Sequence, residues 1–157
     1  MGKAKVLQVS VLAGSAGLDG GFQDSDGEQS TLLNFPQGIM QLDADTLLIA
    51  DRSNGRVRQF DLRTNRLSTW AGVGMPADGD ALDSATAVPK GEARLTAPSS
   101  LCRDPTDPTA IFVATDDMQK VLRRVDALGQ TTIVAGAVDG KEPDPNDEDA
   151  MAEWDRK

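Results

Sequence analysis

The sequence predicts an all-β protein built from repeated four-stranded antiparallel sheets. Three observations predict this: a strand followed by Ala-Gly occurs three times, the apolar runs are short, and turn-forming residues separate the runs. The 15 glycines and 8 prolines among 157 residues are typical of many short elements joined by turns rather than of long helices. A helical bundle is therefore not expected.

The repeated phrase is VSVLAG ending at Gly14, LSTWAG ending at Gly72 and TTIVAG ending at Gly136. These glycines are 58 and 64 residues apart, and Pro36 and Pro98 are 62 residues apart. Such near-constant spacing indicates a repeated structural unit. We expect an outer strand of a preceding unit in residues 1–12, two complete units in 13–72 and 73–136, and an acidic linker with the start of a third repeat in 137–157.

The strands of the first complete unit follow one another between residues 38 and 72. The runs GIMQL, TLLIAD, GRVRQFDL and RLSTWAG are apolar or alternating, and DAD, RSNG and RTN between them carry residues that favour tight turns. This pattern predicts a four-stranded meander. The second strand is apolar on both faces, as is its counterpart at residues 111–114, so both faces of each sheet need to be covered by other sheets.

Long acidic segments separate the units, at residues 15–30, 73–92 and 137–149. Loops of this length are unusual inside a compact meander and are commonly binding segments or linkers. We expect them to connect the outer strand of one sheet to the inner strand of the next.

The formal net charge of -9 disfavours nucleic acid and anionic membrane surfaces as partners, because the average field repels phosphate groups. No apolar run approaches the ~20 residues that a membrane span needs, so we expect a soluble chain. The single cysteine, Cys102, cannot form an internal disulfide. This favours a reducing compartment, either the cytoplasm or an organelle interior.

These motifs resemble the NHL-repeat family, whose signature runs from Ala-Gly through a Gly/Asp-rich loop to Pro-x-Gly-Ile and a turn before a basic strand. The matching stretches are VLAGSAGLDGGFQD, LLNFPQGI and IADRSNGRVRQF, and the second unit carries Ser100 where the first has Gly38. The structural positions of the motif are Gly14, Pro36, Gly38, Asp51, Arg58, Gly72, Pro98, Asp116, Arg123 and Gly136.

The resemblance implies β-propeller blades: here two four-stranded antiparallel blades plus one leading strand. Propellers of this family serve as platforms for proteins or, in some members, for RNA, and a minority are lyases or hydrolase-like. Because the family usually has six blades, we expect either a partial propeller from a longer protein or a subunit that completes a ring with other copies.

Three acidic residues in the first loop, Asp24, Asp26 and Glu28, are weak candidates for a metal site. Closely spaced carboxylates with a Gly turn can bind Ca²⁺, but the ligand spacing of an EF-hand is missing. We therefore favour a solvated acidic loop. Trp154, beside the acidic tail, is expected to pack between sheets or, alternatively, to contact a partner.

Asp51 and Asp116 are expected to end the second strand of each unit and to contact Arg58 and Arg123 across the hairpin. This structural role is favoured over catalysis. The arginines could instead form a basic strip for RNA, but the surrounding acidic loops and the absence of tyrosine argue against it.

The sequence has no histidine, which excludes Ser-His-Asp chemistry and His-ligated zinc for this chain alone. We predict a non-enzymatic scaffold without a cofactor, whose partners are proteins or the copies or blades that complete the propeller. The alternatives are part of a propeller-fold hydrolase or lyase whose active site lies outside this chain, and an RNA-binding module.

Overall fold

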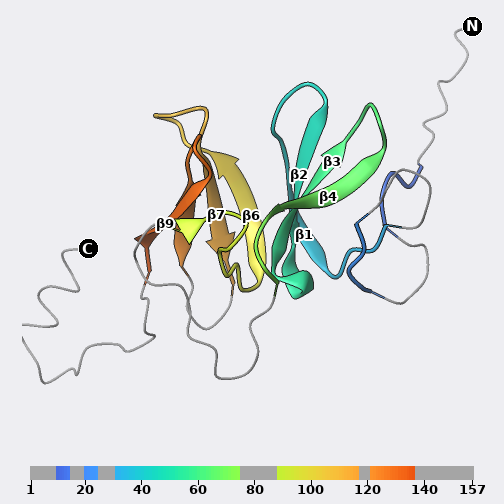
Figure 1. Ribbon diagram of the computed structural model, residues 1–157, viewed down its shortest axis with the longest axis horizontal. Coiled ribbons are helices and arrows are strands. Elements are labelled where there is room, and N and C mark those ends of the chain that lie inside the picture. Colours follow the sequence, from blue (N-terminus) through green and yellow to red (C-terminus); the bar gives the residue numbers. More distant parts are fainter. Residues whose placement is uncertain (1–9, 15–19, 25–30, 75–87, 117–120, 137–157) are drawn as a thin grey trace, which may run out of the picture.

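The computed structural model describes residues 10–14, 20–24, 31–74, 88–116 and 121–136. The described chain is all-β, with two antiparallel sheets standing next to each other in a partial, propeller-like arrangement (Figure 1). This confirms the predicted fold class. Of the predicted leading strand, only residues 10–12 are described, and they lie in irregular backbone; residues 137–157 lie outside the described part. Among the described residues, no helix is long and apolar enough to span a bilayer.

Sheet 1 is a meander of four strands in the order β1-β2-β3-β4. Gly55 ends the short 3₁₀ turn between β2 and β3 with a φ of 59°, and Asn65 adopts a φ of 55° in the turn between β3 and β4. Glycine and asparagine tolerate this left-handed conformation best, which explains why the predicted turns lie where they do. The strands are β1 Pro36–Gln41, β2 Thr46–Asp51, β3 Arg56–Asp61 and β4 Arg66–Ala71, with the turn η1 at Arg52–Asn54.

Sheet 2 repeats this meander and adds one short strand at its edge, in the order β5-β9-β8-β7-β6. Its strands are β5 Val88–Pro89, β6 Pro98–Arg103, β7 Ile111–Thr115, β8 Leu122–Val125 and β9 Gln130–Ala135. The strand β5 lies in the segment predicted to be a loop. Because Pro89 lacks an N–H, a place at the sheet edge is the one that it tolerates.

The backbone repeats from one unit to the next. The glycines of the Ala-Gly phrase, Gly14, Gly72 and Gly136, have φ values of 96°, 98° and 99°. Phe35 and Ala97, each just before the motif proline, have φ values of 50° and 44°. A side chain is strained in this region of backbone space, so its occurrence at equivalent positions marks a true structural repeat.

One predicted equivalence is wrong by one residue. Pro36 pairs with Asp51 across β1 and β2, whereas Pro98 pairs with Thr115 across β6 and β7. Thr115 is therefore equivalent to Asp51, and Asp116 lies one residue beyond the end of β7. The cause is that the turn before Arg123 is one residue longer than the turn before Arg58, which the sequence motif does not reveal.

The two sheets pack face to face in the same orientation. We call the face with Ile49 in sheet 1 and Val113 in sheet 2 the front face, and the face with Leu48 in sheet 1 and Phe112 in sheet 2 the rear face. The rear face of sheet 1 packs on the front face of sheet 2, and the inner strands β1 and β6 lie next to each other. The shared core consists of Leu48, Val57, Ala71, Ala93, Leu95, Ile111, Val113 and Val125.

Gly38 allows the two inner strands to approach closely. A Cβ atom at this position would lie 2.5 Å from the Ser99 carbonyl oxygen, a backbone atom that cannot move aside alone. We expect Gly38→Ala to lower the free energy of unfolding by about 2 kcal/mol through overpacking. Urea denaturation measures this, and Gly91→Ala is the matched control because a Cβ at Gly91 meets nothing within 4 Å. Equal stability of the two variants would mean that β1 and β6 are not in close contact.

Candidate docking surface

The described residues cover one half of the front face of sheet 1. The buried side chains of Ile49 on β2, Phe60 on β3 and Leu67 on β4 pack against Ala13 and Leu33, which precede β1 in the chain. The described N-terminal segments lie on the side of sheet 1 away from sheet 2, shown in blue in Figure 1. These segments therefore cover the outer half of the front face.

A buried ion pair fixes this covered half. Arg58 Nη1 donates to Asp51 Oδ2 at 3.1 Å, and both side chains are fully buried. Asp51 also accepts hydrogen bonds from Asn54 Nδ2 and from the backbone N–H of Asn34, each at 2.7 Å. The predicted contact between Asp51 and Arg58 is confirmed. These donors satisfy the carboxylate from within the chain, as expected for a residue that holds the hairpin.

Arg58 also binds the N-terminal segment. Its second guanidinium nitrogen donates to the Gln23 carbonyl oxygen at 3.2 Å and pairs with the carboxylate of Asp24. The centroid of the Phe22 ring lies 4.0 Å from the guanidinium carbon of Arg56 and 4.7 Å from that of Arg58. Both distances are within the range of cation–π attraction. The segment at residues 20–24 is therefore held by charge and stacking in addition to a single antiparallel bridge between Gln23 and Leu32.

These contacts change the interpretation of the acidic and basic candidates. Asp24, a weak metal candidate, serves as a partner of Arg58, while Asp26, Glu28 and Trp154 lie outside the described residues. Within the described part of the chain, no three acidic, cysteine or histidine side chains form a metal-binding group. Asp116 pairs at 3.6 Å with Arg52 of the other sheet. Arg58 and Arg123 are buried, which fits the packing role favoured for these arginines over a basic strip.

Arg124 forms a second charged cluster, on sheet 2. It donates to Asp104 at 2.8 Å and to Asp107 at 2.6 Å. The hydrogen bond from Arg124, followed by those from Thr106, holds the pKa of Asp104 well below its ordinary 3.8. The hydrogen bonds from Thr109, with a smaller contribution from Arg124, lower the pKa of Asp107.

Acid should therefore weaken the fold through Asp104. A carboxylate whose pKa is lower in the folded state stabilises that state at any pH above its unfolded pKa, and the contribution is lost as pH falls towards the folded pKa. We expect the free energy of unfolding to fall with pH below about 4, and to fall less steeply in Asp104→Asn. Urea denaturation at a series of pH values measures the slope. An unchanged slope in Asp104→Asn, with Asp43→Asn as the exposed control, would contradict this role.

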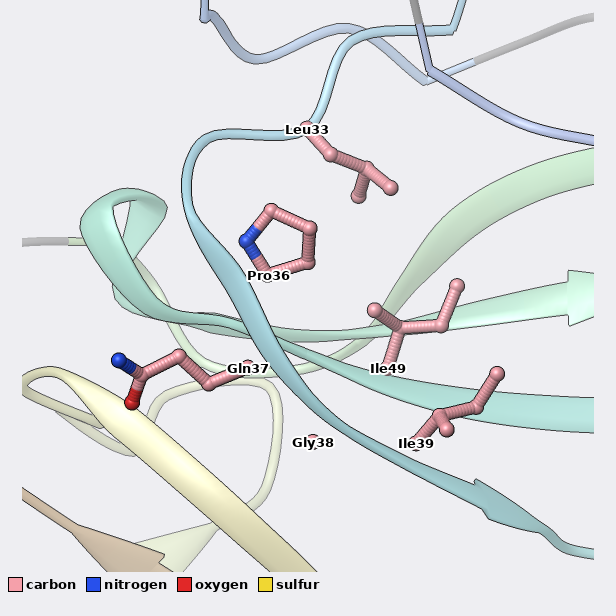
Figure 2. Close-up of a pocket in the computed structure, with 6 residues that line it drawn as sticks. All are labelled: Leu33, Pro36, Gln37, Gly38, Ile39 and Ile49. Atoms are coloured by element: carbon pink, nitrogen blue, oxygen red, sulfur yellow. The ribbon is translucent and has the colours of Figure 1, made fainter. Parts of the chain in front are cut away.

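The inner half of the front face of sheet 1 is an open, mainly apolar groove. It encloses about 280 Å³ and is lined by Leu33, Pro36, Gln37, Gly38, Ile39 and Ile49. Figure 2 shows the side chains of Leu33, Ile39 and Ile49 on one side of β1, with Gln37 pointing away from them. Ile39 is 67% exposed, and the neighbouring Phe35 is 75% exposed. Large apolar side chains exposed together are typical of an interaction surface.

On sheet 2, the surface that corresponds to this groove is covered by the neighbouring sheet 1. The register makes Leu95 equivalent to Leu33 and Val113 equivalent to Ile49. Leu95 and Val113 are fully buried, because the rear face of sheet 1 lies on them. Within the described part of the chain, the groove on sheet 1 is therefore the equivalent surface without a second sheet packed on it.

The sequence contained a signal for this surface. The run TLLIAD is apolar on both faces. Other parts of the protein must therefore pack on Ile49 on one face as well as on Leu48 on the other. The groove itself could not be located, because the pattern does not tell how much of the front face the N-terminal segments protect.

Comparison with known proteins supports the fold alone. No family model matches the sequence, and no curated protein matches it. A solved structure, a structural genomics protein of unknown function from Bacteroides thetaiotaomicron VPI-5482, matches 80% of this chain with a TM-score of 0.51 and 18% sequence identity. The chain spans 26% of the length of that protein. A fold of this type therefore occurs as part of a longer polypeptide.

Proposed function

We propose that this chain is a two-blade section of an NHL-type β-propeller and acts as a non-enzymatic scaffold that binds proteins. The repeated backbone geometry and the rear-to-front packing of the sheets support the propeller assignment. Each sheet buries both faces only when it has a neighbour on either side, which is the rule of propeller and solenoid repeats.

The observation that carries the proposal is the open groove on the front face of sheet 1. On sheet 2 the equivalent residues Leu95 and Val113 are fully buried under a β-sheet and Leu101 is partly buried against it, so the groove has the shape and chemistry to receive a β-sheet. Gln37 is its one polar side chain among the described lining residues, which suits an apolar protein surface better than a nucleotide or sugar. RNA binding has less support, because Arg56 and Arg58 already contact Phe22.

Affinity capture with matched variants tests the scaffold function. The immobilised chain is incubated with an extract of its source cells treated with nuclease, and bound proteins are compared between wild type, Ile39→Asp and Leu128→Asp. Leu128 is 86% exposed at a hairpin tip, so its variant controls for an added surface charge. We expect proteins that bind wild type and Leu128→Asp but not Ile39→Asp. Binding that is identical in all three, or that disappears with nuclease, would contradict the proposal.

A further inference from the structure

We infer that the groove on the front face of sheet 1 is the docking site for the rear face of sheet 2 from a second copy of this chain. This inference rests on the proposed function and names its partner. The association is head to tail, because two different surfaces meet, and such contacts produce rings or open chains of subunits rather than closed pairs.

The contact between the two sheets within one chain supplies the template. There, Met40 and Leu48 on the rear face of sheet 1 belong to the core that buries Leu95 and Val113 on the front face of sheet 2. The front face of one sheet therefore packs against the rear face of another sheet of the same type. Each chain carries one further surface of each type, the front face of sheet 1 and the rear face of sheet 2.

The free rear face of sheet 2 matches the rear face that docks inside the molecule. Pairing across the strands places Phe112 at the position of Leu48, Ala114 at that of Ala50 and Leu122 at that of Val57. Leu48 and Val57 are fully buried, whereas Phe112 and Leu122 are only partly buried. The same apolar pattern thus stands on a surface that the described residues cover only in part.

Charged side chains at the edge of the contact are also complementary, both within one chain and between two copies. Within one chain, Arg52 on the rear side of the contact pairs with Asp116 on the front side at 3.6 Å. Between two copies the roles are exchanged, so that Asp116 would stand on the rear side and Arg52 on the front side. Opposite charges meet again, and the Asp116 side chain is 61% exposed and accessible to a second guanidinium.

Two features make the contact between copies weaker than the internal one. Ser100 stands where sheet 1 has Gly38, so its Cβ keeps the docking β6 slightly farther from β1. In addition, Ala13 and Gly14 occupy the place that Ala71 and Gly72 occupy on sheet 2. The described anchors of these two residues are the packing of Ala13 and a hydrogen bond of 2.7 Å from the Gly14 N–H to Thr31 Oγ1. The end of the incoming β9 displaces them.

Sedimentation equilibrium of paired variants tests the inference. We expect the wild type to self-associate with rising concentration, and Ile39→Asp and Phe112→Asp each to weaken association at least about ten-fold. Mixed together, the two variants should form a 1:1 heterodimer, because one keeps the rear face and the other keeps the groove. Val134→Asp replaces Phe112→Asp if the latter fails to fold, because Val134 is 47% exposed and adjoins Ala135, which pairs with Leu122 of the rear face. Ser100→Gly should tighten association at least about five-fold by removing the Cβ atom.

The outcomes separate this inference from the proposed function. A wild type that stays monomeric at the highest concentration tested overturns docking of a second copy, even where Ile39-dependent capture of another protein upholds the scaffold. Self-association that Ile39→Asp leaves unchanged, or a mixture that forms no heterodimer, also overturns it. Leu128→Asp should associate like the wild type, and a loss there would assign the contact to another surface.

Discussion

Replacing Arg58 by methionine is expected to lower the free energy of unfolding by about 3 kcal/mol. Arg58 and Asp51 are both fully buried, so the variant leaves the Asp51 carboxylate without a compensating charge. Removing one partner of a buried ion pair commonly costs about 3–5 kcal/mol. The variant also releases the carbonyl of Gln23 and the carboxylate of Asp24, which loosens the N-terminal segment over β3.

Urea denaturation of Arg58→Met and of an exposed control measures this effect. Arg63 pairs with Asp45 at 3.7 Å, but its side chain is 75% exposed. Arg63→Met should therefore change stability by less than about 1 kcal/mol. If both variants lost a similar, small amount, Arg58 would not anchor the covered half of the front face.

The second large effect is expected from Leu48→Ala, at about 3 kcal/mol. Leu48 is fully buried in the core that the two sheets share, and deletion of a buried leucine side chain combines lost burial with a cavity. Because the core belongs to both sheets, the variant should unfold in a single transition at lower urea concentration.

Circular dichroism during urea denaturation records the transition of Leu48→Ala, with Leu128→Ala as the exposed control. Leu128 is 86% exposed, so the control should unfold like the wild type. Two separate transitions, or a loss below about 1 kcal/mol, would indicate that the sheets do not stabilise each other through this face.

Local sequence determined most of the strand arrangement. The meander of sheet 1 was predictable because Gly55 and Asn65 occupy left-handed turn positions and the runs between the turns have strand periodicity. The three Ala-Gly phrases correctly marked a repeat, since their glycines share one backbone conformation. These features depend on neighbours in the chain and need no tertiary information.

The errors arose where structure depends on distant contacts. The one-residue difference between Asp51 and Asp116 came from a longer turn, and β5 forms only because β9 offers an edge. The candidate site changed for the same reason. Asp24 is separated from Arg58 by 34 residues, so the spacing of residues within the loop does not reveal its ion-pair partner. The groove depends on which half of a face the N-terminal segments cover.

Methyl nuclear Overhauser measurements on the labelled protein test the central claim, that the rear face of sheet 1 packs on the front face of sheet 2. We expect cross-peaks from the Leu48 methyls to those of Ile111 or Val113, which share one core. In a dilute sample we expect none from Ile39 to either residue, because Ile39 faces the open groove. Cross-peaks from Ile39 to Val113 in place of those from Leu48 would contradict the packing and, with it, the assignment of the groove.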